Sequence, residues 1–159
     1  MHDMLVRLAH LQEADPLVCR IREECGVLIR QCRPYELHLL QRWVRENFSP
    51  KWVSEATVAM SHCPPACFIA TQQVRIVGFA CYDTTSRGFF GPMGVSEKLR
   101  GCGVGRALLL TGLQRMREMG YAYAIIGGVG PADFYRKVVG ATDIEDSTPG
   151  IYVDILNEE

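Results

Sequence analysis

The stretch GPMGVSEKLRGCGVGR, residues 91–106, decides the fold of this chain. It starts inside an apolar run, residues 88–95, that predicts a strand, and it ends where an apolar helical pattern over residues 104–119 begins. The glycines at 101, 103 and 105 leave the N–H groups of the turn accessible, because no Cβ blocks the approach to the backbone. These donors, the positive end of the helix dipole and two flanking arginines predict a site for a phosphate or pyrophosphate.

Two other kinds of glycine loop are excluded by the neighbouring residues. A P-loop requires a lysine after its last glycine and then a serine or threonine, whereas Arg106 and Ala107 follow Gly105 here. A dinucleotide fingerprint requires a third glycine where this chain has Arg106, and an acidic residue about 20 residues further on. Only Glu118 and Asp133 lie near that position, and neither ends a predicted strand.

A third kind of loop fits. The run RGCGVG, residues 100–105, matches the pattern Arg/Gln-x-x-Gly-x-Gly/Ala and resembles the acetyl-CoA pyrophosphate loop of the GNAT acyltransferase family. A predicted strand over residues 121–126 follows the helix. Then comes FYRKVVGA, residues 134–141, which is similar to the Phe-Tyr-x-Lys-x-Gly-Phe segment of that family. The resemblance is clear from about residue 74 to residue 141 and weaker from residue 27.

The resemblance implies an α/β fold. We expect a mixed, mostly antiparallel central sheet of about seven strands, flanked by about four to five helices. The sheet should splay between its fourth strand, residues 88–95, and its fifth, residues 121–126, and so open a slot for the pantetheine arm. Pro92 agrees with this expectation, because proline cannot donate a hydrogen bond to a neighbouring strand.

Two segments lie outside the core pattern. Residues 1–26 are expected to be an extension packed on a single acyltransferase domain, residues 27–159. Met4, Leu5, Leu8 and Leu11 have helical spacing and predict a short helix that ends near residue 15. Residues 17–22 fit either a helix or a hairpin arm. At the other end, residues 141–144 and 151–156 are expected to form the two arms of a final hairpin.

Composition narrows the class of protein. The chain has 159 residues, of which 48% are hydrophobic and 22% charged, as expected for one globular domain. A net charge of −1 gives no reason to expect a nucleic-acid partner or an anionic membrane surface. There is no apolar run of membrane-spanning length, and the first residues lack the order of a signal peptide. We therefore expect a cytoplasmic protein without a membrane partner.

The seven cysteines are an odd number, and several lie in apolar runs, so free thiols are expected rather than a disulfide framework. His62, Cys63 and Cys67 are close in sequence, but two prolines separate them and no second ligand pair follows, so no metal site is expected. Cys102 is interpreted as a small side chain in the phosphate loop rather than a redox centre.

The resemblance also implies site residues. Acetyl-CoA is the implied co-substrate, with no metal. Tyr135 matches the tyrosine that protonates the departing thiolate, with a buried core aromatic as the alternative interpretation. The Val95 N–H is the implied donor to the thioester oxygen. The remaining cofactor-binding positions are the strand backbone and the phosphate loop: Met93, Gly94, Val95, Arg100, Gly101, Cys102, Gly103, Val104, Gly105 and Arg106.

No general base stands out. Residues 88–94 carry no Asp or Glu, which many relatives use there. Tyr82, Asp83, Glu97 and Asp133 remain open, as does a chain of water molecules. The chain also has Gly128 where many relatives have an asparagine that contacts the cofactor arm.

These expectations lead to a function. The chain should move an acetyl group from acetyl-CoA to a primary amine of a small molecule or peptide, by direct attack in a ternary complex. A non-catalytic acyl-CoA-binding module is the alternative, and a protein that binds ATP or NAD is a third. The acceptor and the use of longer acyl-CoAs stay open, as does the role of Trp52 as substrate contact or core residue. So does the oligomeric state, although homodimers are frequent in the family.

Overall fold

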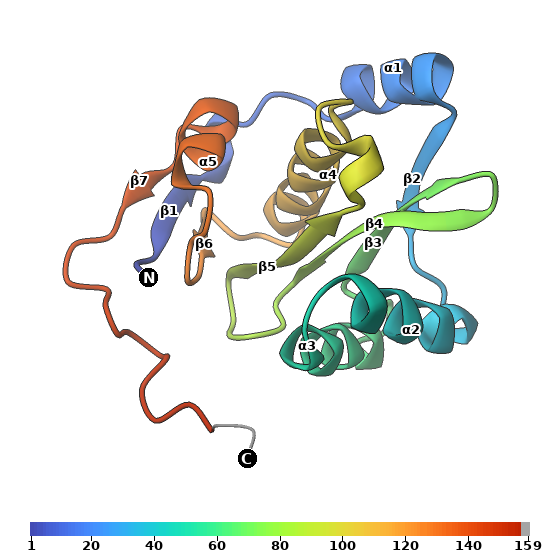
Figure 1. The fold of residues 1–159 in the computed structure, drawn as a ribbon. Coiled ribbons are helices and arrows are strands. Elements are labelled where there is room, and N and C mark those ends of the chain that lie inside the picture. The colour runs from blue at the N-terminus through green and yellow to red at the C-terminus, as the bar shows by residue number, and fades with distance from the viewer. Residues whose placement is uncertain (157–159) are drawn as a thin grey trace.

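The computed structural model describes residues 1–156, which form a sheet with helices on both faces (Figure 1). The strands are β1 (Met4–Arg7), β2 (Val27–Gln31), β3 (Cys67–Gln72), β4 (Arg75–Tyr82), β5 (Phe89–Val95), β6 (Tyr123–Ile126) and β7 (Thr142–Asp143). The α-helices are α1 (Asp15–Cys25), α2 (Leu37–Asn47), α3 (Pro50–Ser61), α4 (Val104–Glu118) and α5 (Ala132–Val139). Short 3₁₀ turns are η1 (Leu8–His10), η2 (Pro34–Glu36) and η3 (Glu97–Leu99).

The strand order in the seven-stranded sheet is β2-β3-β4-β5-β6-β1-β7. Only β5 and β6 run parallel, and every other pair of neighbours is antiparallel. The predicted fold class, a mixed and mostly antiparallel sheet with about seven strands and about five helices, is confirmed. Helices α2 and α3 cover one face of the sheet, and α1, α4 and α5 lie on the other (Figure 1).

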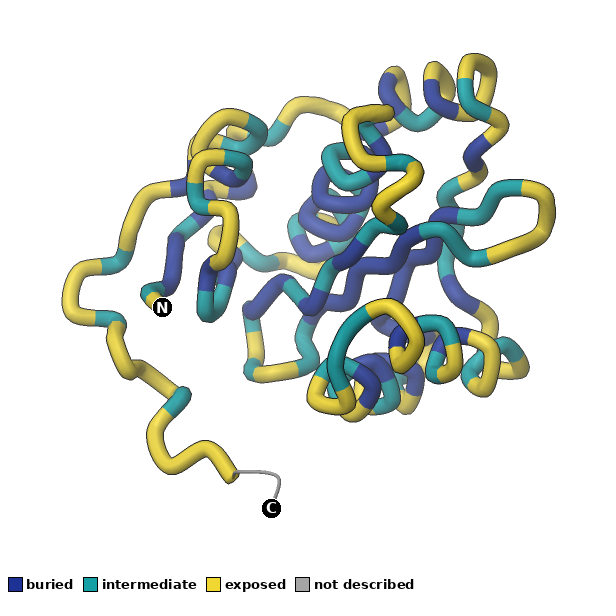
Figure 2. The backbone as a smooth tube through the Cα atoms, in the orientation of Figure 1, coloured by how far each residue is buried: buried dark blue, intermediate teal, exposed yellow. Residues whose placement is uncertain are grey.

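Helix α4 is the central element of the core, because most of its circumference is buried (Figure 2). Leu108 packs beneath β4, where a Cβ on Gly78 would lie 3.0 Å from its Cδ1. Gly112 faces β5, and a Cβ there would lie 2.6 Å from the ring of Phe90. These close approaches fix α4 directly under β4 and β5.

The opposite face of the sheet is held by aromatic side chains. Phe79 of β4 lies 6.0 Å from Trp43 of α2 and 6.0 Å from Trp52 of α3, measured between ring centroids. Phe48, in the turn between these helices, stacks 4.9 Å from Trp52. Ser49 then caps α3 by accepting the N–H of Trp52, and this cap fixes where the second helix begins.

The helix predicted over residues 4–11 is wrong. Met4–Arg7 is strand β1, which lies between β6 and β7. Met4, Val6 and Leu8 are fully buried at a spacing of two, which is the period of a strand. Residues 17–22, left open between helix and hairpin arm, belong to α1. The division into an extension, residues 1–26, and a domain, residues 27–159, stays a prediction. Strand β1 of the extension belongs to the same sheet as the strands of the expected domain. The last three residues of that domain lie outside the described part.

The predicted final hairpin is correct only in its first arm. Thr142–Asp143 pairs with β1 as β7, but residues 151–156 form no strand. Strand β7 pairs with β1 at the edge of the sheet, and residues 151–156 do not pair with its outer side. The segment therefore runs along the outside of the molecule, where Ile151 and Val153 are exposed (Figure 2).

The predicted strands over residues 88–95 and 121–126 and the predicted helix over residues 104–119 are present as β5, β6 and α4, with ends shifted by one or two residues. Among the described residues, no helix is both long and apolar enough to cross a membrane.

Candidate functional site

A slot begins where β5 and β6 part. The two strands pair only through Phe89 with Ile125 and Phe90 with Ile126. Beyond these pairs, residues 93–95 of β5 stay paired with β4, and no strand among the described residues lies on their other side. The splay that the sequence predicted between these strands is therefore present, and it leaves one edge of β5 open.

The open edge presents particular backbone groups. The N–H of Ser96 donates to the carbonyl of Val77 at 2.8 Å, which makes Ser96 and Val77 a hydrogen-bonded pair. Pairs alternate along an antiparallel ladder, so Val95 opposite Gly78 and Met93 opposite Ala80 are non-hydrogen-bonded pairs. Their N–H and C=O groups therefore point away from β4 and into the slot.

Gly94 has a different setting from its two neighbours. It stands opposite Phe79 at a hydrogen-bonded position, so its backbone groups serve β4 rather than the slot. Its Cα faces the aromatic cluster, and a Cβ there would collide with the ring of Phe48. Of the three predicted positions on this strand, the structure thus turns the backbone of Met93 and Val95 toward the slot and that of Gly94 away from it.

The glycine loop closes the far end of the slot. Gly101 and Gly103 have φ angles of 90° and 86°, a region that glycine adopts without strain. The Cys102 N–H donates to Leu99. Within residues 1–156, the remaining N–H groups of the loop and first helical turn have no acceptor in the protein. They belong to Gly101, Gly103, Val104, Gly105 and Arg106. Free N–H groups at a helix N-terminus attract an anion.

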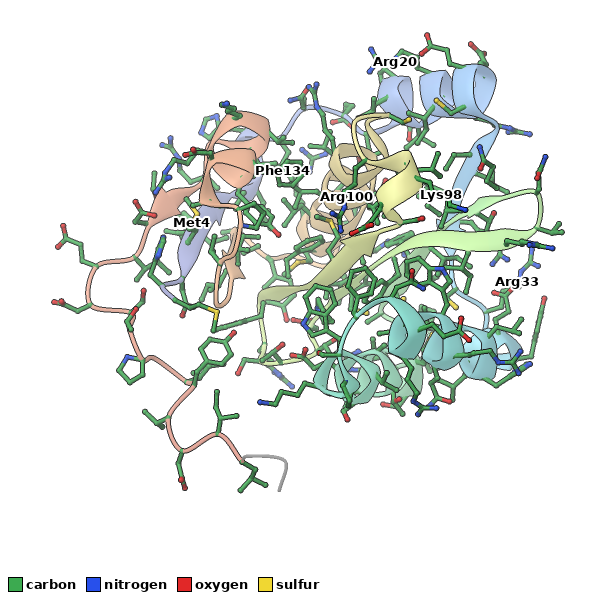
Figure 3. The ribbon with its side chains drawn as sticks, viewed as in Figure 1. Met4, Arg20, Arg33, Lys98, Arg100 and Phe134 are labelled. Carbon is green, nitrogen blue, oxygen red and sulfur yellow. The ribbon has the colours of Figure 1, made fainter. Side chains whose placement is uncertain are left out.

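The two arginines of the loop differ. Arg100 is exposed, and its guanidinium lies 3.5 Å from the carboxylate of Glu97, a surface pair that restrains it little. The Arg106 guanidinium donates instead to Gln12 at 2.9 Å, and its Nε is buried without a partner. Figure 3 shows Arg100 and Lys98 at this loop, with Phe134 facing it from α5.

Helix α5 supplies the second wall. A Cβ on Gly105 would lie 3.9 Å from Cζ of Phe134 and 3.6 Å from Cγ2 of Val95, so α4, α5 and β5 converge there. Tyr135 is buried on the same helix, and burial raises the pKa of its phenol above the usual value of 10.0. Its hydroxyl has no hydrogen-bond partner among the described residues, and burial is the one cause of the shift. The phenol is therefore protonated at neutral pH and has a proton to donate.

Three of the four candidate bases have partners within the protein. Asp83 accepts the Tyr121 hydroxyl and the Gly88 N–H, which ties the β4–β5 turn to the segment before β6. Glu97 and Asp133 are exposed beside Arg100 and Arg136. The phenol of Tyr82 is buried, and burial raises its pKa. The three carboxylates thus have partners of their own, and Tyr82 has burial alone.

The sequence analysis did not identify two residues near the slot, Asp3 and Tyr152. The Gly128 N–H, at the exit of β6, donates to a carboxylate oxygen of Asp3 at 2.8 Å. The hydroxyl of Tyr152 lies against Gly127, one residue earlier. Asp3 and Gly128 are more than a hundred residues apart in the sequence, and Tyr152 reaches Gly127 from the C-terminal segment. No local sequence motif therefore marks either contact.

The cysteines are unpaired, as expected. All seven are free thiols, with Cys102 exposed in the loop and Cys67 buried in β3. Over residues 1–156, no group of three or more His, Cys, Asp or Glu side chains is placed to hold a metal ion.

Comparison with known proteins agrees with this geometry. The model of the acetyltransferase (GNAT) family matches residues 34–141, about two thirds of the chain. The chain belongs to the GNAT family. In this GNAT domain the strand with the open edge is β5, and the glycine loop lies between β5 and α4. No curated protein matches its sequence.

Solved structures have the same fold at low sequence identity. A GCN5-related glucosamine N-acetyltransferase region of a fungal multi-domain GH3 β-N-acetylglucosaminidase superposes with a TM-score of 0.73 and 17% identity, over 90% of this chain and 19% of that chain. A GCN5-related N-acetyltransferase from Sphaerobacter thermophilus gives 0.66 and 18%, over 90% and 48%. A GNAT acetyltransferase from Brucella melitensis in complex with acetyl-CoA gives 0.52 and 20%, over 70% and 80%. The GNAT domain thus spans about half or less of the first two chains.

Proposed function

We propose that this GNAT domain transfers the acetyl group of acetyl-CoA to a primary amine of a small molecule or peptide, by direct attack in a ternary complex. The family supports acetyl transfer from acetyl-CoA in general, and a GNAT structure that contains acetyl-CoA shares the fold. The observation that carries the proposal is the continuous path from the open edge of β5 to the free N–H groups of the loop before α4.

Each part of the path has a role in the proposal. Met93 and Val95 hydrogen-bond the extended pantetheine arm through the backbone, as an added strand would. The Val95 N–H donates to the thioester oxygen and stabilises the negative charge that develops there. The N–H groups of the loop hold the pyrophosphate, and Arg100 adds a free positive charge.

Tyr135 completes the proposed chemistry. Acetyl-CoA supplies an activated acetyl group, and the CoA thiolate leaves when the amine attacks the thioester carbonyl. The Tyr135 phenol remains protonated across neutral pH and donates its proton to that thiolate.

A thermal-shift series tests the proposal, with acetyl-CoA, CoA, ATP and NAD measured in parallel. A ligand that binds only the folded state raises the melting temperature by mass action. We expect stabilisation by acetyl-CoA and CoA alone, followed by amine-dependent release of CoA thiol in an acceptor screen. No shift with either CoA species, or a shift with ATP or NAD that CoA does not compete, would contradict the assignment of the loop.

A non-catalytic acyl-CoA-binding module is the second candidate. One observation favours it, because the three carboxylates among the sequence-predicted bases, Asp83, Glu97 and Asp133, already have a hydrogen-bond or ion-pair partner. For a non-catalytic module we expect stabilisation by acetyl-CoA and no turnover with any amine. For an acetyltransferase we expect stabilisation by acetyl-CoA and turnover with an amine.

A further inference from the structure

The glycine loop carries a thiol that meets a second thiol from α1. Cys102 lies in the loop between Gly101 and Gly103, and Cys25 is the last residue of α1. Both are free cysteines, Cys102 exposed and Cys25 partly exposed. The two thiols lie within hydrogen-bonding contact of each other. The sequence indicates no such pair, because the two residues are far apart in the chain.

The packing of α1 on the loop explains this contact. A Cβ on Gly103 would lie 3.6 Å from Cδ1 of Leu17 and 3.7 Å from Cγ2 of Ile21, so α1 lies directly against the loop. Cys25 follows Ile21 by four residues, and side chains four residues apart share one face of a helix. The face of α1 that contacts Gly103 therefore also directs the Cys25 thiol toward the loop. Figure 1 shows α1 beside the turn that leads into α4.

The end of α1 is held more firmly than the loop. Gln72 of β3 donates to the Cys25 carbonyl at 2.7 Å, and Gly26 closes the helix in a left-handed conformation. Cys102 instead lies between two glycines, whose backbone angles change at little cost. A covalent bond brings two sulfurs closer than a hydrogen-bonded contact does. Such a bond would therefore draw the loop toward α1 rather than move the helix.

Three other thiols provide a contrast. Cys67 of β3 is a hydrogen-bond partner of both Cys32, just after β2, and Cys81 of β4. At most 1% of each of these three residues is exposed. Oxidation of a thiol requires access for the oxidant. Access to solvent therefore distinguishes the Cys25–Cys102 pair from the buried thiols of the sheet.

We propose that Cys25 and Cys102 form a redox modification site, and that a disulfide between them lowers the affinity of the loop for acetyl-CoA. The inference rests on the proposed function, because it requires the loop to hold the pyrophosphate. The free N–H groups of Gly101 and Gly103 lie on either side of Cys102. A bond that draws Cys102 toward α1 displaces both donors from the positions in which they hold the anion.

Hydrogen peroxide is the oxidant in this proposal. The sulfur of Cys102, the more exposed of the two, attacks one peroxide oxygen, the oxygen–oxygen bond breaks, and one water leaves as a sulfenic acid forms. The sulfur of Cys25 then attacks the sulfur of Cys102, the sulfur–oxygen bond breaks, and a second water leaves. The two thiols lose two electrons and two protons, and the peroxide takes up both. A dithiol reductant reverses the bond by exchange.

Occupancy of the loop opposes the oxidation. If the disulfide weakens acetyl-CoA binding by some factor, acetyl-CoA favours the reduced protein by the same factor. Bound acetyl-CoA should therefore slow the formation of the disulfide, and a ligand that does not occupy the loop should not.

The test compares wild type with Cys25→Ser, which removes the partner thiol, and with Cys19→Ser. Cys19→Ser is the matched control, because Cys19 is an exposed thiol on the same helix and both thiols of the pair remain. Each protein is treated with hydrogen peroxide, with or without acetyl-CoA, and then with catalase. Trypsin releases residues 23–30 and 101–106 as separate peptides with one cysteine each, so non-reducing mass spectrometry measures the link directly. Titration calorimetry measures acetyl-CoA binding before oxidation, after it and after dithiothreitol.

We expect wild type and Cys19→Ser to form the linked peptides, to bind acetyl-CoA about tenfold more weakly once oxidised, and to recover with dithiothreitol. Acetyl-CoA should slow the link in both proteins. Cys25→Ser should keep its affinity under the same treatment.

Three outcomes overturn the proposal. The first is no link between the two peptides in wild type, and the second is a link that leaves the affinity unchanged. The third is an equal loss of affinity in Cys25→Ser, because oxidation of Cys102 alone would then suffice. If reduced wild type does not bind acetyl-CoA, the proposed function fails and the control of binding with it, whether or not the peptides are linked.

Discussion

The ring of Phe48 lies directly against Gly94, in the space that a side chain at position 94 would need. A Cβ there would collide with Cζ of Phe48 and lie 2.7 and 2.8 Å from its two Cε atoms. Gly94→Ala should therefore displace the ring or the strand and lower the free energy of unfolding by about 1–3 kcal/mol. Urea denaturation measures this change. Gly130→Ala is the control, because nothing lies within 4 Å of its added Cβ. Equal stability of the two variants would contradict the packing described here.

Arg100 and Arg106 should respond differently to substitution. Arg100 is bound only by Glu97 at the surface, whereas Arg106 donates to Gln12. We expect Arg100→Ala to weaken acetyl-CoA binding about tenfold, the loss of one charge-assisted hydrogen bond, with less effect at high salt. Arg106→Ala should lower the melting temperature more than Arg100→Ala does. Titration calorimetry and thermal denaturation measure the two effects, and the reverse order would contradict the assignment.

Tyr135→Phe should separate binding from turnover. The phenol makes no hydrogen bond that the variant would break within residues 1–156, so acetyl-CoA affinity should be unchanged while kcat falls by about 10²-fold. In wild type the raised pKa moves any alkaline loss of rate from this group to higher pH than an ordinary tyrosine would give. Tyr35→Phe, at a residue 69% exposed, is the control. An unchanged kcat would support the core-aromatic interpretation.

Glu36 should make the free energy of unfolding depend on pH in the acid range. Arg30 holds its carboxylate through hydrogen bonds of 2.6 and 2.8 Å and lowers the pKa of Glu36 from 4.5 to about 2. Because the folded-state pKa is the lower one, this stabilisation is complete above pH 4.5 and is lost as pH falls toward 2. Glu36→Gln should remove about 1–3 kcal/mol at pH 7 and flatten the acid limb. Glu23→Gln, at an exposed residue without an ion pair, should leave the melting temperature unchanged between pH 7 and 2 relative to wild type.

Cys102 should report occupancy of the loop. Its side chain is exposed beside the free N–H groups, as those of Cys19 and Cys63 are exposed elsewhere. Iodoacetamide should label all three, and acetyl-CoA should slow labelling of Cys102 alone. Peptide mass spectrometry measures the three rates within one sample. Equal protection of all three, or none of Cys102, would contradict binding at this loop.

The sequence predicted those parts that local pattern decides. The β5–α4 stretch combines an apolar strand, glycines and a buried helix within thirty residues of chain, so its fold and its anion site were both visible. The splay of β5 from β6 came from the family resemblance and from Pro92. The direction of the Met93 and Val95 backbone needed the pairing register, which a sequence does not display.

Long-range pairing decided what the sequence could not predict. Strand β1 (Met4–Arg7) is too short for its hydrophobic alternation to be recognised. The strands that pair with it, β6 and β7, lie over a hundred residues away in the sequence. Ile151, Val153 and Ile155 alternate as a strand would, but residues 151–156 pair with no strand of the sheet. Asp3 reaches Gly128 only through that pairing, so the acidic group nearest the opening of the slot carries no motif.

The insertion of β1 between β6 and β7 sets an order for assembly during synthesis. This strand leaves the ribosome before all the others, yet both of its partners are made near the opposite end of the fold. Until then Met4 and Val6 have no strand to pair with, and the sheet can grow only from β2 to β6. Closing it joins residue 4 to residue 143, a contact of very long sequence separation that is expected to form late. The nascent protein therefore carries an unpaired apolar strand through most of translation, the kind of segment that chaperones protect.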